Sequence, residues 1–316
     1  MFSKASTSIQ KKAFTAMSYH TKVAVVGAGC GGQSLIAQLA RSGKVSANEI
    51  TVFDPSTEHH YQPGYTSIAG GVYGDATKTK SHYEAKHVVR RQDELLSQTP
   101  GVNWQQKAVT SFNPSANEIE LSDGSRATYD VLVVNPGLSL RYDQIKGAQE
   151  ALDDENAPVG SMYTLKGAYK TSMLRDAFRG GNAVFTCPVF PIKCGGAPQK
   201  ITYLAESTFR ANGVREQTQM RYYSGTPIIF PPNDDFSEAL TETCESKGIE
   251  KFLKHSLVEV DKDNRVASFK NLDTGDIVTQ DFDLLHIVPP QSAPEFVAKS
   301  DLAHETGWLD VNINTL

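Results

Sequence analysis

Val23-Ala-Val-Val-Gly-Ala-Gly-Cys-Gly-Gly32 is the stretch of this 316-residue sequence that decides the fold. Its small and β-branched residues predict a buried strand, and its glycines complete the pattern G-x-G-x-x-G at Gly27, Gly29 and Gly32. The first glycine permits a tight turn, the second lets the backbone approach a pyrophosphate, and the third lets the next helix pack on the sheet. The helix N-terminus then holds the phosphates. The stretch therefore predicts a dinucleotide-binding site.

The residues that follow this stretch support the prediction. Gln33–Arg41 carries apolar residues at helical spacing, and Ile50-Thr-Val-Phe53 predicts a second parallel strand. In this kind of site an acidic residue about 20 residues after the glycines binds a ribose hydroxyl. Asp54 lies close to that distance from the glycines. Pro55-Ser-Thr57 offers no cation for a 2′-phosphate, which favours FAD or NAD. The motif does not distinguish between these two.

Composition limits the class of protein. A hydrophobic content of 39%, a charged content of 21% and a mean hydropathy of −0.36 predict a soluble globular chain, and the length favours two domains. The net charge of −5 and the lack of long basic runs disfavour nucleic acid as a partner. The sequence also lacks an apolar run of about 18 residues, the length that spans a membrane.

The first 21 residues have an unusual composition. They contain Lys4, Lys11 and Lys12 among several serines and threonines, and the first acidic residue of the chain is Glu49. Because the first strand is expected at about Lys22, residues 1–21 are interpreted as a mitochondrial transit peptide, with lysine in place of the usual arginine. A disordered tail is the alternative.

Further β segments and loops are expected on both sides of a domain boundary at Asp143–Pro158. Glu58–Gly71 reads as a loop that folds over a cofactor, with Gln62 facing it, and Gly137 ends a buried strand at a tight turn. The expected strands and hairpins lie at 101–109, 119–124, 129–134, 182–186, 256–260, 266–269, 276–279 and 284–288, the last four forming a meander. Polar residues from Thr77, with His82 and His87, predict a solvated helix and loop.

The second domain carries a thiol where a second glycine motif is expected. After the helix predicted at Lys166–Arg179 and the strand that follows it, the sequence reads Cys187-Pro-Val-Phe-Pro-Ile-Lys-Cys-Gly-Gly-Ala-Pro198. Cys194 precedes a helix predicted at Gln199–Arg210, whose positive end favours a thiolate together with Lys193. A thiolate attacks a disulfide sulfur or an electrophilic flavin carbon. The alternative is a buried structural cysteine.

The other cysteines and the histidines carry weaker predictions. Cys30 is expected to pack inside the phosphate turn, and Cys244 to lie in the core on a helix at Phe236–Lys247. Cys187 could pair with Cys194 only if the intervening loop folds back. No C-x-x-C pattern is present, and the adjacent His59 and His60 diverge, so no metal site is expected.

Several motifs together resemble the mitochondrial sulfide:quinone oxidoreductases, which are flavoproteins with two dinucleotide-binding domains. They are the leader, Val25–Gly32, Tyr61-Gln-Pro63, Pro191-Ile-Lys-Cys-Gly-Gly-Ala-Pro-Gln-Lys200, His286-Ile-Val-Pro-Pro290 and Gly307-Trp-Leu-Asp-Val311. The resemblance runs from about Lys22 to Leu316. It implies an α/β fold with two Rossmann-like domains: a transit peptide at 1–21, an FAD-binding domain at 22–145, a second domain with the redox cysteine at 146–290, and a return to the first domain at 291–316.

The resemblance also implies a cofactor, substrates and a location. FAD would be held by Gly27, Gly29, Cys30, Gly31, Gly32, Asp54, Gln62, Val109 and Gly137. Cys194 would be one of two redox cysteines that oxidise hydrogen sulfide, with sulfur passing to an acceptor such as glutathione and electrons passing through FAD to ubiquinone. The protein would lie at the mitochondrial inner membrane.

Two departures from the family pattern leave alternatives open. Asn135-Pro136-Gly137 stands where the family often has Ala-Thr-Gly. The Gly-Asp flavin motif, the second redox cysteine and the C-terminal helices that meet membrane and quinone are missing from these residues, so the chain is expected to be C-terminally truncated. The alternatives are an FAD-dependent NADH:quinone or disulfide reductase, and a catalytically impaired FAD-binding fragment.

Overall fold

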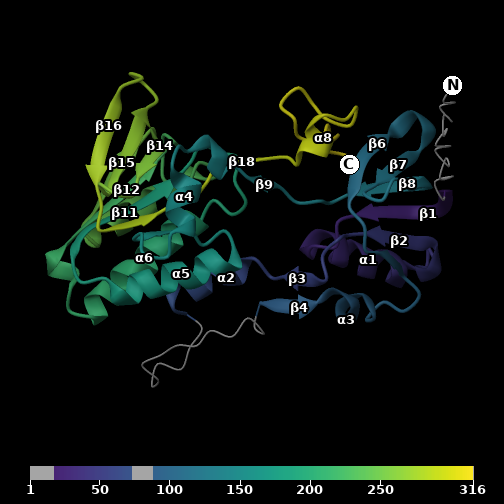
Figure 1. Ribbon diagram of the computed structural model, residues 1–316, viewed down its shortest axis with the longest axis horizontal. Coiled ribbons are helices and arrows are strands. Elements are labelled where there is room, and N and C mark those ends of the chain that lie inside the picture. Colours follow the sequence, from purple (N-terminus) through teal and green to yellow (C-terminus); the bar gives the residue numbers. More distant parts are fainter. Residues whose placement is uncertain (1–17, 73–87, 316) are drawn as a thin grey trace, which may run out of the picture. The chain divides into compact units, whose positions relative to one another are not determined.

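The structure is a computed structural model that describes residues 18–72 and 88–315 (Figure 1). The chain forms two compact units. The first contains the described parts of Met1–Thr57, Arg91–Gly137 and Glu295–Leu316, and the second those of Glu58–Arg90 and Leu138–Pro294. The predicted polar segment from Thr77 through His87 and the residues before Ser18 lie outside the described residues.

The first unit is built on a six-stranded sheet in the order β5-β2-β1-β8-β7-β6. Its strands are β1 (Ser18–Val26), β2 (Ile50–Phe53), β5 (Asn103–Gln105), β6 (Val109–Asn113), β7 (Glu118–Leu121) and β8 (Arg126–Val134). The first three and β8 run parallel, while β6 and β7 form an antiparallel extension. Helix α1 (Cys30–Ser42) connects β1 to β2, which confirms the predicted strand, turn, helix and strand.

Burial explains why the opening stretch forms the centre of this sheet. Val23–Val26 are almost fully buried between β2 and β8, as the apolar run predicts. Ile36 of α1 is buried against the sheet, and Gly43 ends the helix with φ +68°. The strand begins at Ser18, earlier than the expected start near Lys22.

The second unit is another Rossmann-like layer structure, as the sequence predicts. Its parallel sheet has the order β10-β17-β11-β12-β13, with β10 (Val159–Gly160), β11 (Gly181–Cys187), β12 (Thr218–Ser224), β13 (Ile249–Leu253) and β17 (Leu284–His286). Helices α2 (Pro63–Gly70), α5 (Leu165–Ala177) and α6 (Ala197–Ala211) share one hydrophobic core with the sheet. An antiparallel sheet of β14 (His255–Asp261), β15 (Val266–Asn271) and β16 (Ile277–Asp281) contributes to a second core.

Two expectations for this unit are wrong. The segment expected to be a loop at Glu58–Gly71 contains β3 (Glu58–His60) and helix α2, most of whose residues are buried. The last strand of the expected meander, β17, instead joins the parallel sheet between β10 and β11. Helix α2 and strand β17 form because segments distant in sequence pack on them. The local sequence pattern does not reveal such packing.

The remaining elements are short, apart from the helix at Asp234–Ser246. They are β4 (Val89–Arg91), α3 (Gln92–Leu96), β9 (Ser139–Leu140), α4 (Ala148–Asp153), α7 (Asp234–Ser246), β18 (Gln291–Ser292) and α8 (Glu295–Ala298). Across the described part of the chain, every helix is too short or too polar to cross a membrane.

Candidate active site

The glycine turn after β1 is shaped by close backbone contacts. Gly27 has φ +94°, and a Cβ atom there would lie 2.2 Å from the carbonyl oxygen of Asn135. A Cβ atom on Gly32 would lie 2.0 Å from the carbonyl oxygen of Gly27. Only glycine fits at these two positions, because backbone atoms cannot move aside as a flexible side chain can.

The space above the turn is open where a phosphate is expected. A Cβ atom on Gly29 would meet nothing within 4 Å, and one on Gly31 would meet only the side chain of Asn135, at 3.5 Å. Helix α1 starts at Cys30 and has no side-chain cap, and the N-terminus of a helix attracts anions. Cys30 is exposed, so the expectation that it packs inside the turn is wrong. The turn fits a pyrophosphate.

Asp54 stands at the end of β2, where the ribose-binding acid is expected. Its Oδ2 accepts a hydrogen bond from the N–H of Ala28 (2.7 Å), and its Oδ1 accepts one from the N–H of Ser56 (2.8 Å). Each carboxylate oxygen keeps a further lone pair for a hydroxyl group. The side chain of Gln92, which is buried, donates to the carbonyl of Ala28 (3.2 Å) and so braces the same turn. The sequence carries no signal for this role of Gln92.

Val109 and Gly137 complete the predicted residues of the first unit. Val109 is buried in the core at the start of β6, so only its backbone is suited to contact a ligand. Gly137 has φ +78° and open space around it. It lies two residues after Asn135, whose N–H donates to the carbonyl of Val26 (2.8 Å) beside the glycine turn.

Cys194 lies in the second unit, in the loop that joins β11 to α6. Its side chain is exposed, and its backbone has φ +64°, an unusual conformation for a residue other than glycine. Its carbonyl accepts a hydrogen bond from the N–H of Ala197 (3.2 Å), the first residue of α6. The predicted position before a helix start is confirmed, and the buried alternative for Cys194 is wrong.

The loop that carries Cys194 is held by two glutamines from distant parts of the chain. The Nζ atom of Lys193 donates to Oε1 of Gln62 (2.7 Å), and the backbone N–H of Lys193 donates to Oε1 of Gln291 (2.7 Å). The same Nζ atom lies 5.3 Å from the ring centre of Tyr163. Burial lowers the pKa of Lys193 to about 8. Gln62, predicted to face a cofactor, thus contacts the cysteine loop of its own unit.

Cys187 is a different kind of thiol. It is buried at the end of β11, where its Sγ donates a hydrogen bond to the carbonyl oxygen of Pro188 (3.5 Å), and burial raises its pKa to about 11. It lines a cavity of about 210 Å³ together with Thr186, Val189 and other residues. A protonated thiol is a poor nucleophile, so Cys187 lacks the reactivity expected of a redox partner. Cys244 is buried on α7, as predicted.

His286 is a buried residue that the sequence did not single out as a functional group. Burial lowers its pKa to about 3, and its Nε2 accepts a hydrogen bond from the N–H of Met162 (3.2 Å). A neutral imidazole in this place joins β17 to the segment after β10. Among the residues that the structure describes, no group of three or more metal-ligating side chains converges.

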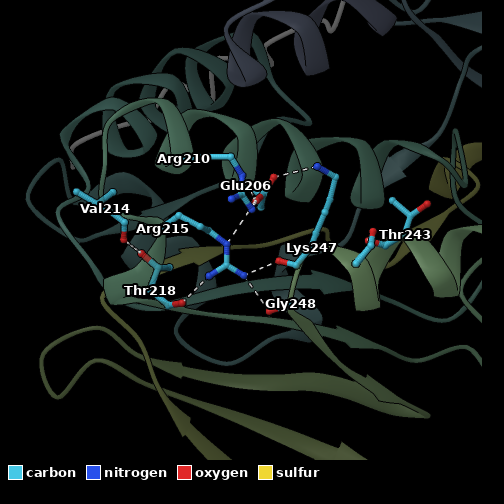
Figure 2. Close-up of polar contacts among 9 residues, drawn as sticks. Glu206, Arg210, Val214, Arg215, Thr218, Thr243, Lys247 and Gly248 are labelled. Carbon is cyan, nitrogen blue, oxygen red and sulfur yellow. Dashed lines mark hydrogen bonds and ion pairs between the residues drawn. The ribbon is translucent and has the colours of Figure 1, made fainter.

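Helix α6, which begins beside Cys194, is anchored at its other end by a buried carboxylate (Figure 2). Glu206 is fully buried and binds Lys247 (2.9 Å), Arg210 (3.1 Å to Nε) and Arg215 (3.5 Å). Arg215 also donates to the carbonyls of Thr218 (2.8 Å) and Gly248 (2.9 Å). The network joins α6, the end of α7 and the starts of β12 and β13.

The chain is similar to known proteins, and these similarities agree with the fold described above. The family model described as pyridine nucleotide-disulphide oxidoreductase matches residues 21–173. A mitochondrial sulfide:quinone oxidoreductase of Mus musculus is 34% identical over 299 residues, which cover 94% of this chain and 62% of that protein. Three such curated relatives are 33–34% identical, and the chain spans less than two thirds of the length of each.

Solved structures share the fold at lower identity. A chain in the mitochondrial ATP synthase structure of Tetrahymena thermophila has a TM-score of 0.76 at 20% identity, covering 98% of this chain and 71% of that one. The sulfide:quinone oxidoreductase of Aquifex aeolicus has a TM-score of 0.70 at 18% identity, covering 88% of this chain and 60% of that one. These likenesses confirm the Rossmann-like fold.

Proposed function

Because this chain belongs to the family of the mitochondrial sulfide:quinone oxidoreductases, we propose that it provides the flavin-binding unit and the sulfur-handling cysteine of such an enzyme. The proposed reaction oxidises hydrogen sulfide and passes the electrons to ubiquinone. The observation that carries the proposal is the exposed Cys194 at the start of α6, in a Rossmann-like unit whose glycine turn has been replaced.

We propose FAD as the cofactor of the first unit. The open turn at Gly29 and Gly31 and the uncapped start of α1 suit its pyrophosphate, and Asp54 suits a ribose hydroxyl. When bound, FAD supplies a two-electron acceptor. Further proposed contacts in this unit are Val109, Gly137 and Cys30.

Cys194 is the proposed catalytic residue. Cys194 lies three residues before Ala197, the first residue of the 15-residue helix α6, and directly after Lys193, whose side chain binds Gln62. The thiolate is the form of cysteine that reacts with sulfur species. The two glutamine contacts of Lys193 hold the loop in which Cys194 has its positive φ. We propose that Sγ of Cys194 and the sulfur of hydrogen sulfide become joined in a persulfide, that the two protons released go to solvent, and that the two electrons would be taken up by bound FAD. The outer sulfur of the persulfide then passes to the thiolate of a small thiol such as glutathione.

An NADH-dependent reductase is the competing function, and the second unit argues against it. Pro188-Val-Phe-Pro191 follows β11 at the place where a nicotinamide dinucleotide would need glycines. We propose a mitochondrial location for the protein, because its curated relatives are named as mitochondrial. We also propose contact with the inner membrane as part of the proposed reaction with ubiquinone.

The test is an anaerobic titration of the purified 316-residue chain followed by visible absorption. We expect FAD to copurify and its absorption band to bleach or shift with sulfide but not with NADH. Cys194→Ser should abolish the response to sulfide, while Cys244→Ser, a matched change at a buried cysteine, should keep it. Bleaching by NADH alone would favour the competing reductase, and a flavin that ignores both would contradict oxidation of sulfide by this chain.

A further inference from the structure

The cavity that Cys187 lines lies in the second unit, at the carboxyl ends of β11 and β17. Its volume is about 210 Å³. Three of its lining residues, Thr186, Cys187 and Val288, are buried, and two others, Gln144 and Val189, are exposed. The cavity therefore reaches from the core of the unit toward its surface.

The order of the strands gives this position a meaning. In the sheet, β12 and β13 follow β11 on one side, and β17, which comes later in the chain, pairs with β11 on the other side. The chain thus reverses its direction across the sheet between β11 and β17. Parallel α/β sheets bind ligands outside the carboxyl ends of their strands, at such a switch point. The cavity lies where sheets of this kind bind ligands.

The size of the cavity and the residues after β11 exclude a dinucleotide. A pyrophosphate needs glycines for close backbone approach, but Pro188 and Val189 follow β11. Pockets for drug-sized ligands hold about 300–1,000 Å³, which is more than this cavity offers. In another protein, an engineered cavity of about 150 Å³ binds benzene. The volume here therefore fits a molecule with about one ring.

The lining excludes an ion as well. Every residue that lines the cavity in the described part of the chain is uncharged. A charged ligand would lose its hydration there and gain no opposite charge in return. The hydroxyl group of Ser256 and the amide group of Gln144 supply neutral hydrogen-bonding groups instead. The chemistry of the lining therefore selects an uncharged molecule with a polar group.

Hydrogen bonds fix the buried end of the cavity. Oγ1 of Thr186 donates to the carbonyl of His286 (3.1 Å) and accepts from the N–H of Val288 (3.0 Å), which ties β11 to the segment after β17. The N–H of Gly225 donates to the carbonyl of Cys187 (2.9 Å). Because this end is already ordered, a ligand that enters it pays little for ordering the protein.

We propose that this cavity is a binding site for a small uncharged organic molecule, about one ring in size, that carries a hydroxyl or amide group. The site goes beyond the proposed function, because neither sulfide nor flavin takes part in it and Cys194 is not among its lining residues. A bound ligand would cover the thiol of Cys187.

The experiment uses that thiol as a reporter on the full 316-residue chain at neutral pH. The probes are phenol, an uncharged ring with one hydroxyl group, and benzoate, a ring of similar size with a negative charge. Hydroxyethyl methanethiosulfonate, a small uncharged reagent, modifies the thiols, and peptide mass mapping gives the rate at each cysteine. The rates are measured over a series of probe concentrations.

We expect phenol to slow the modification of Cys187, because phenol and the reagent compete for one cavity. The rate should fall by about fivefold when the phenol concentration is four times its Kd. Benzoate at the same concentrations should leave the rate unchanged. Cys244, a buried thiol that does not line the cavity, is the internal control, and phenol should not alter its modification.

Two variants place the effect in the cavity. Ile145→Phe puts a larger side chain on a lining position and should remove the protection by phenol, whereas Ile145→Val should keep it. Gln144→Trp, at an exposed lining position where folding tolerates the change, should weaken the protection.

Three results would overturn the inference. They are a rate at Cys187 that phenol does not change, protection by benzoate equal to that by phenol, and full protection by phenol in both Ile145→Phe and Gln144→Trp. None of these measurements depends on sulfide or flavin, so the proposed function stands or falls separately.

Discussion

Replacing Glu206 by glutamine should destabilise the second unit, because it removes the only charge that three cations share in the network of Figure 2. Breaking a fully buried ion pair costs about 3–5 kcal/mol. Here the side chain of Arg215 is 12% exposed, but those of Lys247 and Arg210 are 33% and 59% exposed, so water compensates part of the loss. We therefore expect a loss of about 2–4 kcal/mol in the free energy of unfolding.

The assay is urea unfolding followed by far-ultraviolet circular dichroism, with hydrogen exchange to locate the change. Peptides from α6, the end of α7 and β13 should lose protection first. Glu245→Gln is the matched control, since Glu245 is 66% exposed and pairs with Lys251 in the same unit. It should cost less than about 1 kcal/mol.

The pH dependence gives an independent check. Burial alone would raise the pKa of Glu206, but hydrogen bonds from Lys247 and Arg210 and their charges lower it below its ordinary value of 4.5. Its contribution to stability is therefore present above that value and is lost as the pH falls through the folded-state pKa. The gap between the unaltered protein and Glu206→Gln should narrow in acid. A gap below about 1 kcal/mol at neutral pH, or one that widens in acid, would refute the reasoning.

Three further predictions concern the candidate site. Cys194→Gly should be more stable than Cys194→Ala by about 1 kcal/mol in urea unfolding, because glycine adopts a positive φ without strain; equal stability would contradict this. Cys187, whose pKa is raised to about 11, should react with iodoacetamide far more slowly than Cys194 at pH 8 and faster once the pH rises toward 11, and rapid labelling at pH 8 would disprove its protonated state. Gly32→Ala should lower the ratio of bound flavin to protein in absorption spectra at least tenfold, because its Cβ atom would overlap the carbonyl of Gly27. A full flavin content would contradict binding of the cofactor at the glycine turn.

The sequence predicted the glycine turn and the position of Cys194 best, because residues close in sequence determine both. Gly27 and Gly32 are required by close backbone contacts, and a buried strand precedes them, so a short pattern identifies the whole turn. The position of Cys194 follows in the same way from the glycines and proline that begin α6.

The wrong expectations for the second unit have one physical cause, which is that the deciding contacts are distant in sequence. Helix α2 is buried nearly all round, with Gly70 against Leu204 of α6, so it lacks the one-sided pattern of a surface helix. The strand β17 is placed by its pairing with β10 and β11. The bond between Lys193 and Gln62 joins positions 131 residues apart, and no local pattern indicates it.

The order of the segments along the chain has a consequence for synthesis on the ribosome. The first unit includes helix α8, whose Phe296 stacks on Phe112 of β6 with ring centres 5.5 Å apart. Leu138–Pro294, which belongs to the second unit, must be translated between Gly137 and that helix. At about 5–20 residues per second, the nascent first unit waits roughly 8–30 seconds for helix α8. During that interval the ring of Phe112 lacks the ring of Phe296 and is more open to water and to wrong apolar contacts.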